Sequence, residues 1–383
     1  MSSADAENTS SKVSLAASPQ LRLSPGEIAD PTGVGREMLT DVEVPIVIVG
    51  FRNPQDVVTC LKAIRTQRGA PKFGVFICEN GGSSAFEGLE TAVLEAEELG
   101  PGGAETADWA LHDFVQIRRL RLASLQAPVL LGEARENFGY AGGANAWIRP
   151  FLSESGWTAV WILNPDTLPE PDALAALVDY AKTRNKGMIG SRLMMPGRSD
   201  VAWSRGLRWN KWKVKLMALD ILAPISPPPD PEDVETRMDS PTGCSMYVTR
   251  DCIERIGLMD EKFFLYWEET DWGVRAKATC GVGYAHNSVV SHVGGTTTGA
   301  VRKRSERSAL AVYLPNRNQL HFVRRHHPGW FAWTVFVSFL RTSQYLAVGS
   351  TRNFVAAIQG LAAGLRGETG RPDHLIERLN RQK

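Results

Sequence analysis

The stretch Trp157-Thr-Ala-Val-Trp-Ile-Leu-Asn-Pro-Asp166 is a short apolar run that ends in a carboxylate. Its β-branched and aromatic residues predict a buried strand, and Asn-Pro predicts the turn that stops it, because proline cannot donate to a strand ladder. Ligands of open α/β sheets bind at the carboxyl ends of strands, so Asp166 is a candidate contact for a metal or a substrate. The alternative is an Asx-type turn that starts a helix at Pro171-Asp172.

Two earlier apolar segments have the same design. Residues 44–50 predict a strand that leads into the polar turn 52–56 and a helical repeat. Residues 73–78 predict a second strand, which ends in Glu79 and a flexible loop. Strands that alternate with helices predict an α/β fold, with a parallel sheet covered by helices on both faces, as in nucleotide-binding proteins.

The overall charge of this chain hides an asymmetry. Its 383 residues carry a net charge of +1, but residues 301–383 hold 14 basic and 4 acidic side chains, which is +10 against −9 elsewhere. Residues 1–41 lack an apolar core, which predicts a flexible tail, no signal peptide and a cytoplasmic location. The five cysteines show no C-x-x-C spacing and predict buried free thiols rather than disulfides or a zinc site: Cys60, Cys78, Cys244, Cys252 and Cys280.

A glycine-rich segment, residues 136–147, precedes another predicted helix. Its glycines Gly139, Gly142 and Gly143 would let the backbone approach a ligand, and the free N–H groups of the helix start would favour a diphosphate. Tight packing of the helix on the sheet is the alternative. The spacing matches neither the dinucleotide fingerprint G-x-G-x-x-G nor a P-loop, so it gives no support for those two classes.

Three carboxylates gather in Trp267-Glu-Glu-Thr-Asp-Trp-Gly-Val-Arg275, at the start of a predicted helix. Asp271 and Arg275 are spaced for an i,i+4 ion pair, and acids at a helix start are stabilised by the helix dipole. A structural role therefore explains one or two of these acids. It does not explain Glu268, Glu269 and Asp271 together.

In this order, the segments resemble the motif series of glycosyltransferase family 2, closest to its bacterial rhamnosyltransferase-like branch. The resemblance spans roughly residues 44–327 and implies a GT-A fold, in which a nucleotide-sugar-binding α/β half joins an acceptor-binding half. It implies a flexible tail (1–41), a transferase domain (42–327, with its donor half at about 42–190 and its acceptor half at about 191–327) and a C-terminal helical region (328–383). The motifs are residues 47–53 (V-I-V-G-F-R-N), 78–80 (C-E-N), 136–143, 163–166 (L-N-P-D), 243–246 (G-C-S-M) and 263–275.

The resemblance also implies roles for single residues. Asp166, in the place of the family's D-x-D motif, would contact the diphosphate and Mg²⁺ or Mn²⁺, and His292 would close the metal site. Glu269 would be the general base, because a carboxylate desolvated in a cleft is more basic than in water. Glu268 would contact the acceptor and Asp271 would support them.

The remaining implied contacts fall into three groups. Donor contacts would come from Phe51, Arg52, Asn53, Glu79, Asn80, Asn137, Gly139, Gly142, Gly143, Asn145, Asn164 and Asp166. Acceptor contacts would come from Gly243, Cys244, Trp267 and Glu268, and the diphosphate would be covered by Arg302 and Arg304. Glu79 and Asn164 depart from the family pattern, which has aspartate at both positions.

The implied activity is inverting transfer of a sugar from a dTDP- or UDP-linked donor to a hydroxyl of a glycan or lipid-linked saccharide, in cell-surface polysaccharide synthesis. One alternative is a nucleotidyltransferase, although that class needs a basic glycine-rich signature near the first strand. The other is a non-catalytic glycan-binding or scaffold protein, which would need no carboxylate cluster. Nucleic acid is disfavoured as a partner, because no known binding module accompanies the basic residues.

Two aromatic stretches lie apart from these motifs. Residues 203–213 carry Trp203, Trp209 and Trp212 among basic side chains, which predicts an acceptor-binding or membrane-facing loop, with a surface hairpin anchored by buried tryptophans as the alternative. Residues 330–348 are apolar but too interrupted for a membrane span. With the basic excess they predict an amphipathic helix on the anionic inner face of the cell membrane; packing on the domain or a homo-oligomer contact remain alternatives.

Overall fold

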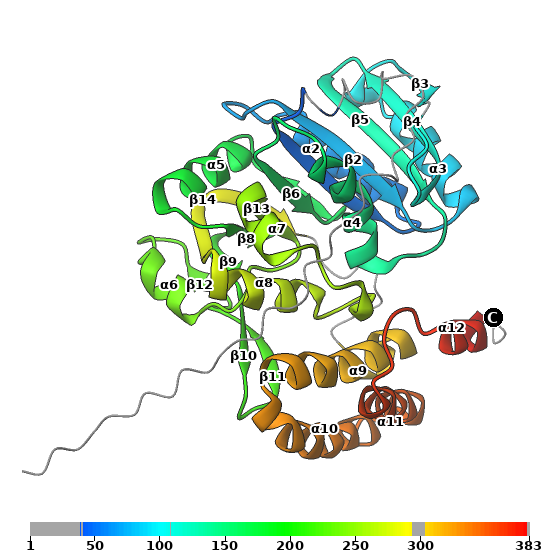
Figure 1. Cartoon of the computed structure of the whole chain (residues 1–383), viewed down its shortest axis with the longest axis vertical. Helices are drawn as coiled ribbons and strands as arrows, with labels where there is room; N and C mark the ends of the chain where they lie inside the picture. Colours follow the sequence, from blue (N-terminus) through cyan, green and yellow to red (C-terminus); the bar gives the residue numbers. More distant parts are fainter. Residues whose placement is uncertain (1–38, 40, 108, 293–302, 381–383) are drawn as a thin grey trace, which may run out of the picture.

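The computed structural model describes residues 39, 41–107, 109–292 and 303–380. They form a mixed α/β sheet with helices on both faces, and a layer of helices at the C-terminal end of the chain (Figure 1). This arrangement confirms the fold class that the sequence predicts.

The three strands expected from the sequence lie side by side in the middle of the sheet. β1 (Val44–Gly50) pairs in parallel with β2 (Phe73–Glu79) on one side and with β6 (Ala159–Leu163) on the other. The full order is β12-β9-β8-β13-β6-β1-β2-β5-β4-β3, and β14 pairs with β7 and β8. Because β1, β2 and β6 are parallel, their carboxyl ends meet at one edge of the sheet, where a ligand of this fold class binds.

The other elements complete the sheet and its two helical faces. The remaining strands are β3 (Gly102–Thr106), β4 (Phe114–Leu122), β5 (Leu125–Ala134), β7 (Thr167–Pro169), β8 (Met188–Met195), β9 (Arg198–Ser204), β10 (Leu207–Asn210), β11 (Lys215–Ala218), β12 (Ala223–Pro224), β13 (Ser245–Thr249) and β14 (Val282–His292). The helices of the α/β part are α2 (Pro54–Ile64), α3 (Ser83–Leu94), α4 (Gly139–Leu152), α5 (Ala173–Arg184), α6 (Pro231–Arg237), α7 (Arg250–Ile256) and α8 (Glu268–Thr279), with short 3₁₀ turns at Glu97–Leu99 and Glu261–Phe263.

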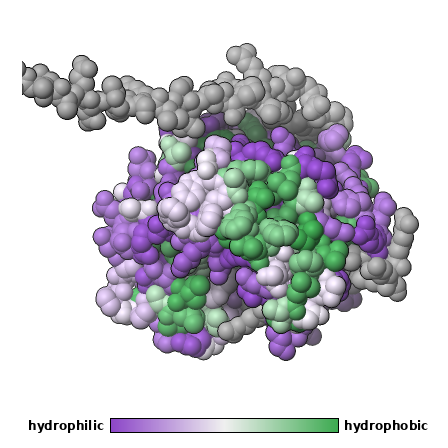
Figure 2. Space-filling view, turned by 90° about the horizontal axis from the view of Figure 1, so that it is seen from below, coloured by the Kyte–Doolittle hydropathy of each residue, from purple (hydrophilic) through white to green (hydrophobic). Residues whose placement is uncertain are grey.

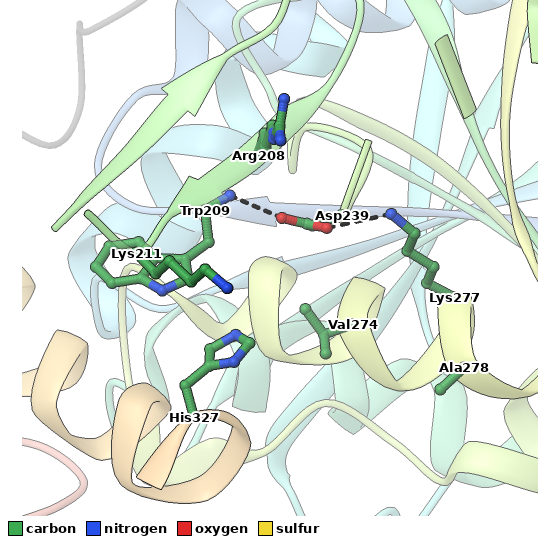
Figure 3. A pocket seen from close by; sticks show the side chains of 8 residues that line it. All are labelled: Arg208, Trp209, Lys211, Asp239, Val274, Lys277, Ala278 and His327. Atoms are coloured by element: carbon green, nitrogen blue, oxygen red, sulfur yellow. Dashed lines mark hydrogen bonds and ion pairs between the residues drawn. The ribbon is translucent and has the colours of Figure 1, made fainter. Parts of the chain in front are cut away.

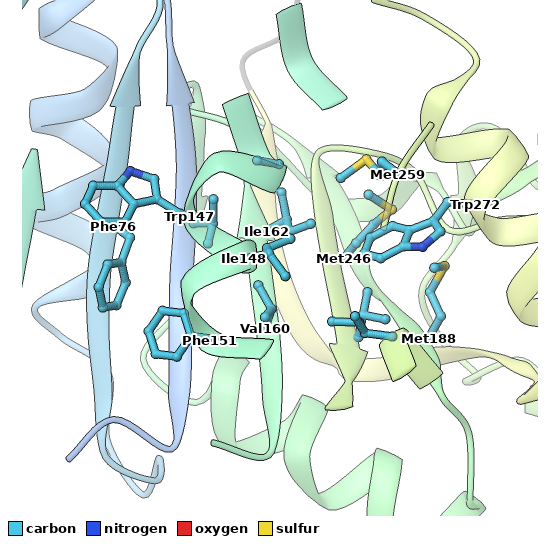
Figure 4. Packing of buried hydrophobic residues seen from close by; sticks show 14 of the residues in the cluster. Phe76, Trp147, Ile148, Phe151, Val160, Ile162, Met188, Met246, Met259 and Trp272 are labelled. Carbon is cyan, nitrogen blue, oxygen red and sulfur yellow. The ribbon is translucent and has the colours of Figure 1, made fainter. Parts of the chain in front are cut away.

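The sheet is buried on both faces, as strands that read as continuous apolar runs require. On β1, Val47 faces one hydrophobic core, and its neighbours Ile46 and Ile48 face the other. Figure 4 shows the first core, in which Phe76 packs against the Trp147 ring at 5.3 Å. These cores fix the carboxyl ends of the strands as a rigid platform.

The C-terminal layer consists of α9 (Ala309–His326), α10 (Phe331–Leu346), α11 (Thr351–Arg366) and α12 (Asp373–Asn380). α11 lies directly against α9, since a Cβ added at Gly360 would be 2.3 Å from the Tyr313 carbonyl oxygen. The β10–β11 hairpin reaches down to α10 (Figure 1). No helix among the described residues is long and apolar enough to cross a membrane.

The prediction of buried free thiols is wrong for two of the five cysteines. Cys60, Cys78 and Cys244 are free and buried as expected, but Cys252 and Cys280 form a disulfide. The 28 residues between them hide the contact, which arises because α7 and the end of α8 pack around the small residue Gly187. A Cβ there would lie 2.6 Å from that of Cys280 and 2.8 Å from that of Cys252.

Candidate active site

Two predicted motifs meet where β6 ends. β13 runs antiparallel to β6 with Ser245 opposite Leu163, so Gly243 and Cys244 come to lie at the edge where the Asn164-Pro165-Asp166 turn begins. The Asn164 N–H donates to the Cys244 carbonyl at 3.0 Å and locks the two segments together. Residues 80 positions apart in the sequence therefore share one site.

Asp166 and His292 are brought together by a three-residue strand. β7 pairs with the end of β14 so that His292 is opposite Thr167, and the His292 Nε2 atom lies 3.3 Å from Asp166 Oδ1. Both side chains are less than a tenth exposed. Burial alone would lower the pKa of His292, but its hydrogen bonds to Asp166 and Cys244 outweigh burial and raise the pKa to about 10.

With that pKa the His292 ring is protonated at neutral pH, so a cation that used its nitrogen as a ligand would have to displace the proton. Once deprotonated, this nitrogen and the Asp166 oxygen could share one cation. Within the described ranges, no three His, Cys, Asp or Glu side chains converge into a metal cluster. Mg²⁺ prefers oxygen donors throughout, whereas imidazole is a better ligand for transition metals. As a candidate pair of ligands, Asp166 and His292 would therefore suit Mn²⁺ better than Mg²⁺.

Glu268 and Glu269 open α8, and both carboxylates are held out of water. Within the described part of the chain, the Oε2 atom of each is buried without a hydrogen-bond partner. Desolvation raises the pKa of both carboxyls, and the charge of Glu269 adds to the effect on Glu268. Backbone N–H groups at the helix start act in the opposite direction. Buried polar atoms are normally satisfied, so two free carboxylate oxygens indicate a site for a ligand or a proton.

A strained loop delivers these two acids. Phe264, Tyr266 and Trp267 have φ values of 64°, 70° and 81°, a region that non-glycine residues rarely occupy. Asn318 of α9 holds the loop, because its side-chain N–H groups donate to the carbonyls of Phe263, Leu265 and Tyr266 at 2.8, 2.9 and 2.9 Å. Strain of this kind persists only where the surroundings enforce it, and it clusters at functional sites.

Asp271 points away from the other two acids and is fully paired. Its Oδ2 accepts from Arg275 Nε at 2.9 Å, its Oδ1 lies 2.7 Å from His326 Nε2, and Arg325 is 3.2 Å away. Burial raises the pKa of Asp271, but the His326 hydrogen bond and the two arginine charges outweigh it and lower the pKa. Asp271 thus forms an ion-pair link between α8 and α9, and its supporting role in the site stays a prediction.

Tyr140 is a site residue that the sequence analysis missed. Its hydroxyl donates to the Gly243 carbonyl at 2.6 Å, and the Gly243 backbone lies against the Glu269 side chain. Burial raises the pKa of Tyr140, and the negative charges of Cys244, Glu268, Glu269 and Asp166 raise it further. Tyr140 therefore lies between the Asp166 pair and the acids of α8. Its position inside the glycine motif, as Gly-Tyr-Ala-Gly-Gly, was the available signal.

The glycine motif itself takes the packing alternative. Gly139 has φ +70°, and a Cβ there would be 2.0 Å from the Phe264 carbonyl oxygen. At Gly142 and Gly143 a Cβ would be 2.7 Å from Phe138 and Val49 respectively. Protein atoms, rather than open space, lie where these glycines lack side chains.

The asparagine side chains around this motif are also hydrogen-bonded to other protein groups. Asn80 donates to the Gly139 carbonyl at 3.0 Å, and Asn137 accepts from the Gly139 N–H at 2.9 Å. Asn145 is buried and donates to Met259 and Glu261. Asn80 and Asn137 therefore shape the turn before Tyr140, whereas Asn145 joins α4 to the segment around Met259 and Glu261.

The carboxyl ends of β1 and β2 carry the other residues predicted to contact the donor. Glu79 Oε1 accepts from the N–H groups of Arg52 and Gly81 at 3.0 and 2.7 Å, while Oε2 is buried and has no partner among the described residues. Desolvation raises the pKa of Glu79. Phe51 is 37% exposed beside it, and Asn53 accepts from the Phe51 N–H at 2.9 Å.

Two groups of predicted residues lie elsewhere. Trp267 is buried against Trp209 at 5.3 Å between ring centroids, in a hydrophobic cluster and not at an open surface. The Arg304 carbonyl accepts from Asn353 of α11 at 2.9 Å, which places this residue beside the C-terminal helices. Arg302 lies outside the described residues.

No family model matches the sequence. The chain is 23% identical over 245 residues to the low-salt glycan biosynthesis hexosyltransferase Agl10 of Haloferax volcanii, a match that covers 62% of this chain and 76% of Agl10. Among solved structures it is similar to the mannosyltransferase PcManGT of Pyrobaculum calidifontis in complex with GDP-Man and Mn²⁺ (15% identity, 84% and 87% of the two chains, TM-score 0.45) and to S. aureus TarS 1-349 with UDP-GlcNAc (8% identity, 85% and 93%, TM-score 0.42). In sequence, then, what this chain is similar to is a hexosyltransferase of glycan biosynthesis.

Proposed function

We propose that this protein is an inverting, metal-dependent glycosyltransferase that moves a hexose from a nucleoside diphosphate sugar to a hydroxyl of a glycan or lipid-linked acceptor. The observation that carries the proposal is the pair of buried, unpartnered carboxylate oxygens of Glu268 and Glu269 near the Asp166–His292 pair. The similarity to a hexosyltransferase of glycan biosynthesis supports the same reaction class.

The proposed chemistry divides between the two halves of the site. Asp166 and His292 are the residues that would hold a divalent cation, which would supply charge neutralisation for the leaving diphosphate when bound. Glu269 takes the proton of the acceptor hydroxyl while the hydroxyl oxygen bonds to the anomeric carbon. The bond from that carbon to the diphosphate oxygen breaks in the same step, so the anomeric centre inverts.

The raised pKa of Glu269 suits this task. A base is most effective when its pKa approaches the working pH, and a buried carboxylate is more basic than one in water. Tyr140 bonds to the Gly243 backbone beside Glu269. In the proposed complex Glu268 would accept a hydrogen bond from the acceptor, and the unpartnered Oε2 of Glu79 would accept one from the donor's ribose or base; the support for both is that these oxygens are buried without a partner among the described residues.

Donor binding tests the proposal directly. Nucleoside diphosphate sugars of several bases are screened with Mn²⁺ and with EDTA, since a ligand that binds only the folded state raises Tm. We expect one donor class to raise Tm with Mn²⁺, and Asp166→Asn to abolish the shift. Asp200→Asn is the matched control, because Asp200 is an exposed carboxylate on β9 paired with Arg198. The proposal would be refuted by full transfer activity in EDTA, or by a screen in which no donor raises Tm.

A further inference from the structure

Helix α10 is turned the opposite way from an ordinary surface helix, which buries its apolar face and exposes its polar one. Its buried positions are Thr334, Ser338 and Thr342, at 0%, 2% and 3% exposure. Phe331 and Val337 pack partly against a hydrophobic cluster. Five other large apolar side chains of α10 are between 41% and 59% exposed, and with Trp212 they are called the aromatic face below: Trp333, Phe336, Phe339, Leu340 and Leu346.

The tip of the β10–β11 hairpin extends this surface. Trp212 is 66% exposed, and its ring meets that of Trp330 edge-on at 4.5 Å. Trp333 Nε1 donates to the Trp212 carbonyl at 3.2 Å, so hairpin and helix are joined. Figure 2 looks onto this end of the molecule and shows hydrophobic side chains gathered over the C-terminal helices, with hydrophilic ones around them. Apolar patches of this kind mark an interaction site.

The chain that carries the aromatic face is basic. Residues 307–367 contain seven arginines and no aspartate or glutamate; of these, Arg317 is fully buried and Arg325 is paired with Asp260. Residues 201–219 contain five basic side chains and no acid; of these, Arg205 is buried and paired with Asp220. Lys211 and Lys213 flank Trp212 directly and are exposed. The partner of this surface should therefore be apolar inside and anionic at its boundary.

A basic pocket of about 370 Å³ lies beside the same hairpin, between β10, α8 and the end of α9 (Figure 3). Its carboxylate, Asp239, accepts from Lys277 at 3.2 Å and from a backbone N–H, so it leaves positive charge in excess. Lys211 links the pocket to the aromatic face. It lines the pocket, and it directly precedes Trp212, which belongs to the aromatic face. Arg208 and His327 complete the polar lining.

We propose that the aromatic face and this pocket dock the protein onto an anionic phospholipid bilayer. The aromatic side chains would enter the boundary between headgroups and acyl chains, where tryptophan is favoured, and the pocket would take a lipid phosphate. Charge favours lipid over a second copy of this chain, because two copies joined here would bring the basic residues of both together. The inference stands independently of the sugar chemistry proposed above.

Co-sedimentation of the full chain with vesicles tests the proposal. We expect binding to phosphatidylcholine vesicles that contain phosphatidylglycerol, weaker binding to phosphatidylcholine alone, and loss of the difference at high salt. The Phe336→Ser/Phe339→Ser double variant should lower vesicle affinity on the order of tenfold or more. Val115→Ser is the matched control, since Val115 is 56% exposed and its strand β4 lies at the other end of the molecule from α10 (Figure 1), and this variant should bind as wild type does.

Each outcome either supports or overturns the docking surface. Lys211→Glu should reduce binding to anionic vesicles while leaving donor-induced Tm shifts intact, which separates this proposal from that of the active site. Wild-type protein that ignores both kinds of vesicle, or a double variant that binds like wild type, overturns it. So does a dimer in sedimentation velocity that the double variant dissociates without any vesicle binding, because the occupant would then be a second copy.

Discussion

Replacing Glu269 with glutamine changes one oxygen to an NH₂ group and keeps the shape of a buried side chain. If Glu269 is the base, the variant loses the lone pair that accepts the acceptor proton. General-base catalysis contributes about 10²–10⁴ in rate, so kcat should fall by roughly that factor while donor-induced Tm shifts survive. The matched variant is Glu268→Gln, which should act mainly on the KM for the acceptor.

The stability of the Glu269→Gln variant distinguishes a catalytic role of Glu269 from a structural one. Folding raises the pKa of Glu269 above its ordinary value of 4.5, so the group favours the native state below that pH and opposes it as pH rises. Glutamine carries no charge and therefore does not oppose the native state as pH rises. Tm of Glu269→Gln should therefore match wild type near pH 4.5 and equal or exceed it at neutral pH.

Two assays on one preparation decide the matter. Transfer from a labelled donor, followed across pH, should show a wild-type rate that rises with pH through a pKa above the ordinary glutamate range. Thermal unfolding across the same pH series gives the stability comparison. A kcat within a few fold of wild type would refute the assignment of Glu269 as the base, and a collapse of Tm at neutral pH would return it to a structural role.

Two further substitutions test the supports of the site. Asp271→Asn removes one charge from a buried ion-pair network and should cost about 3–5 kcal/mol, measured by urea unfolding, while the folded fraction keeps its pH–rate profile; a selective loss of kcat at unchanged stability would contradict this. Gly139→Ala should destabilise much more than Gly82→Ala, although both glycines have positive φ, because only at Gly139 does a Cβ collide with another backbone. Equal melting temperatures for the two variants would contradict the close packing described for Gly139.

The sequence was sufficient for the parts of the site that depend on local pattern. The end of the strand at Leu163 and the acids that open α8 follow from apolar runs and helix signals that span a few residues. The position of His292 could be taken only from the family resemblance, because β7 is three residues long and ends in proline. Such a strand carries no periodicity from which its pairing with β14 could be predicted.

Long-range contacts account for most of what the sequence did not reveal. Asp271 meets His326 across 55 residues, so an acid grouped with Glu268 and Glu269 by sequence belongs to another interaction. The apolar run and the basic excess predicted an amphipathic helix on a membrane at residues 330–348, with packing on the domain or an oligomer contact as alternatives. They could not tell which side chains of this helix face outward, because orientation depends on what the rest of the fold covers. Tyr140 was missed for a similar reason, since its partner Gly243 is 103 residues away.

The hydrogen bonds from Asn318 to the loop before Glu268 have a consequence for protein engineering. One amide on α9 is shared among three carbonyls of a loop that would otherwise leave its strained backbone. A chimaera that takes the segment after residue 308 from another protein must therefore bring an amide to this position, or the acids of α8 lose their placement. The C-terminal helices can therefore be exchanged only for a segment that supplies an amide at the position of Asn318.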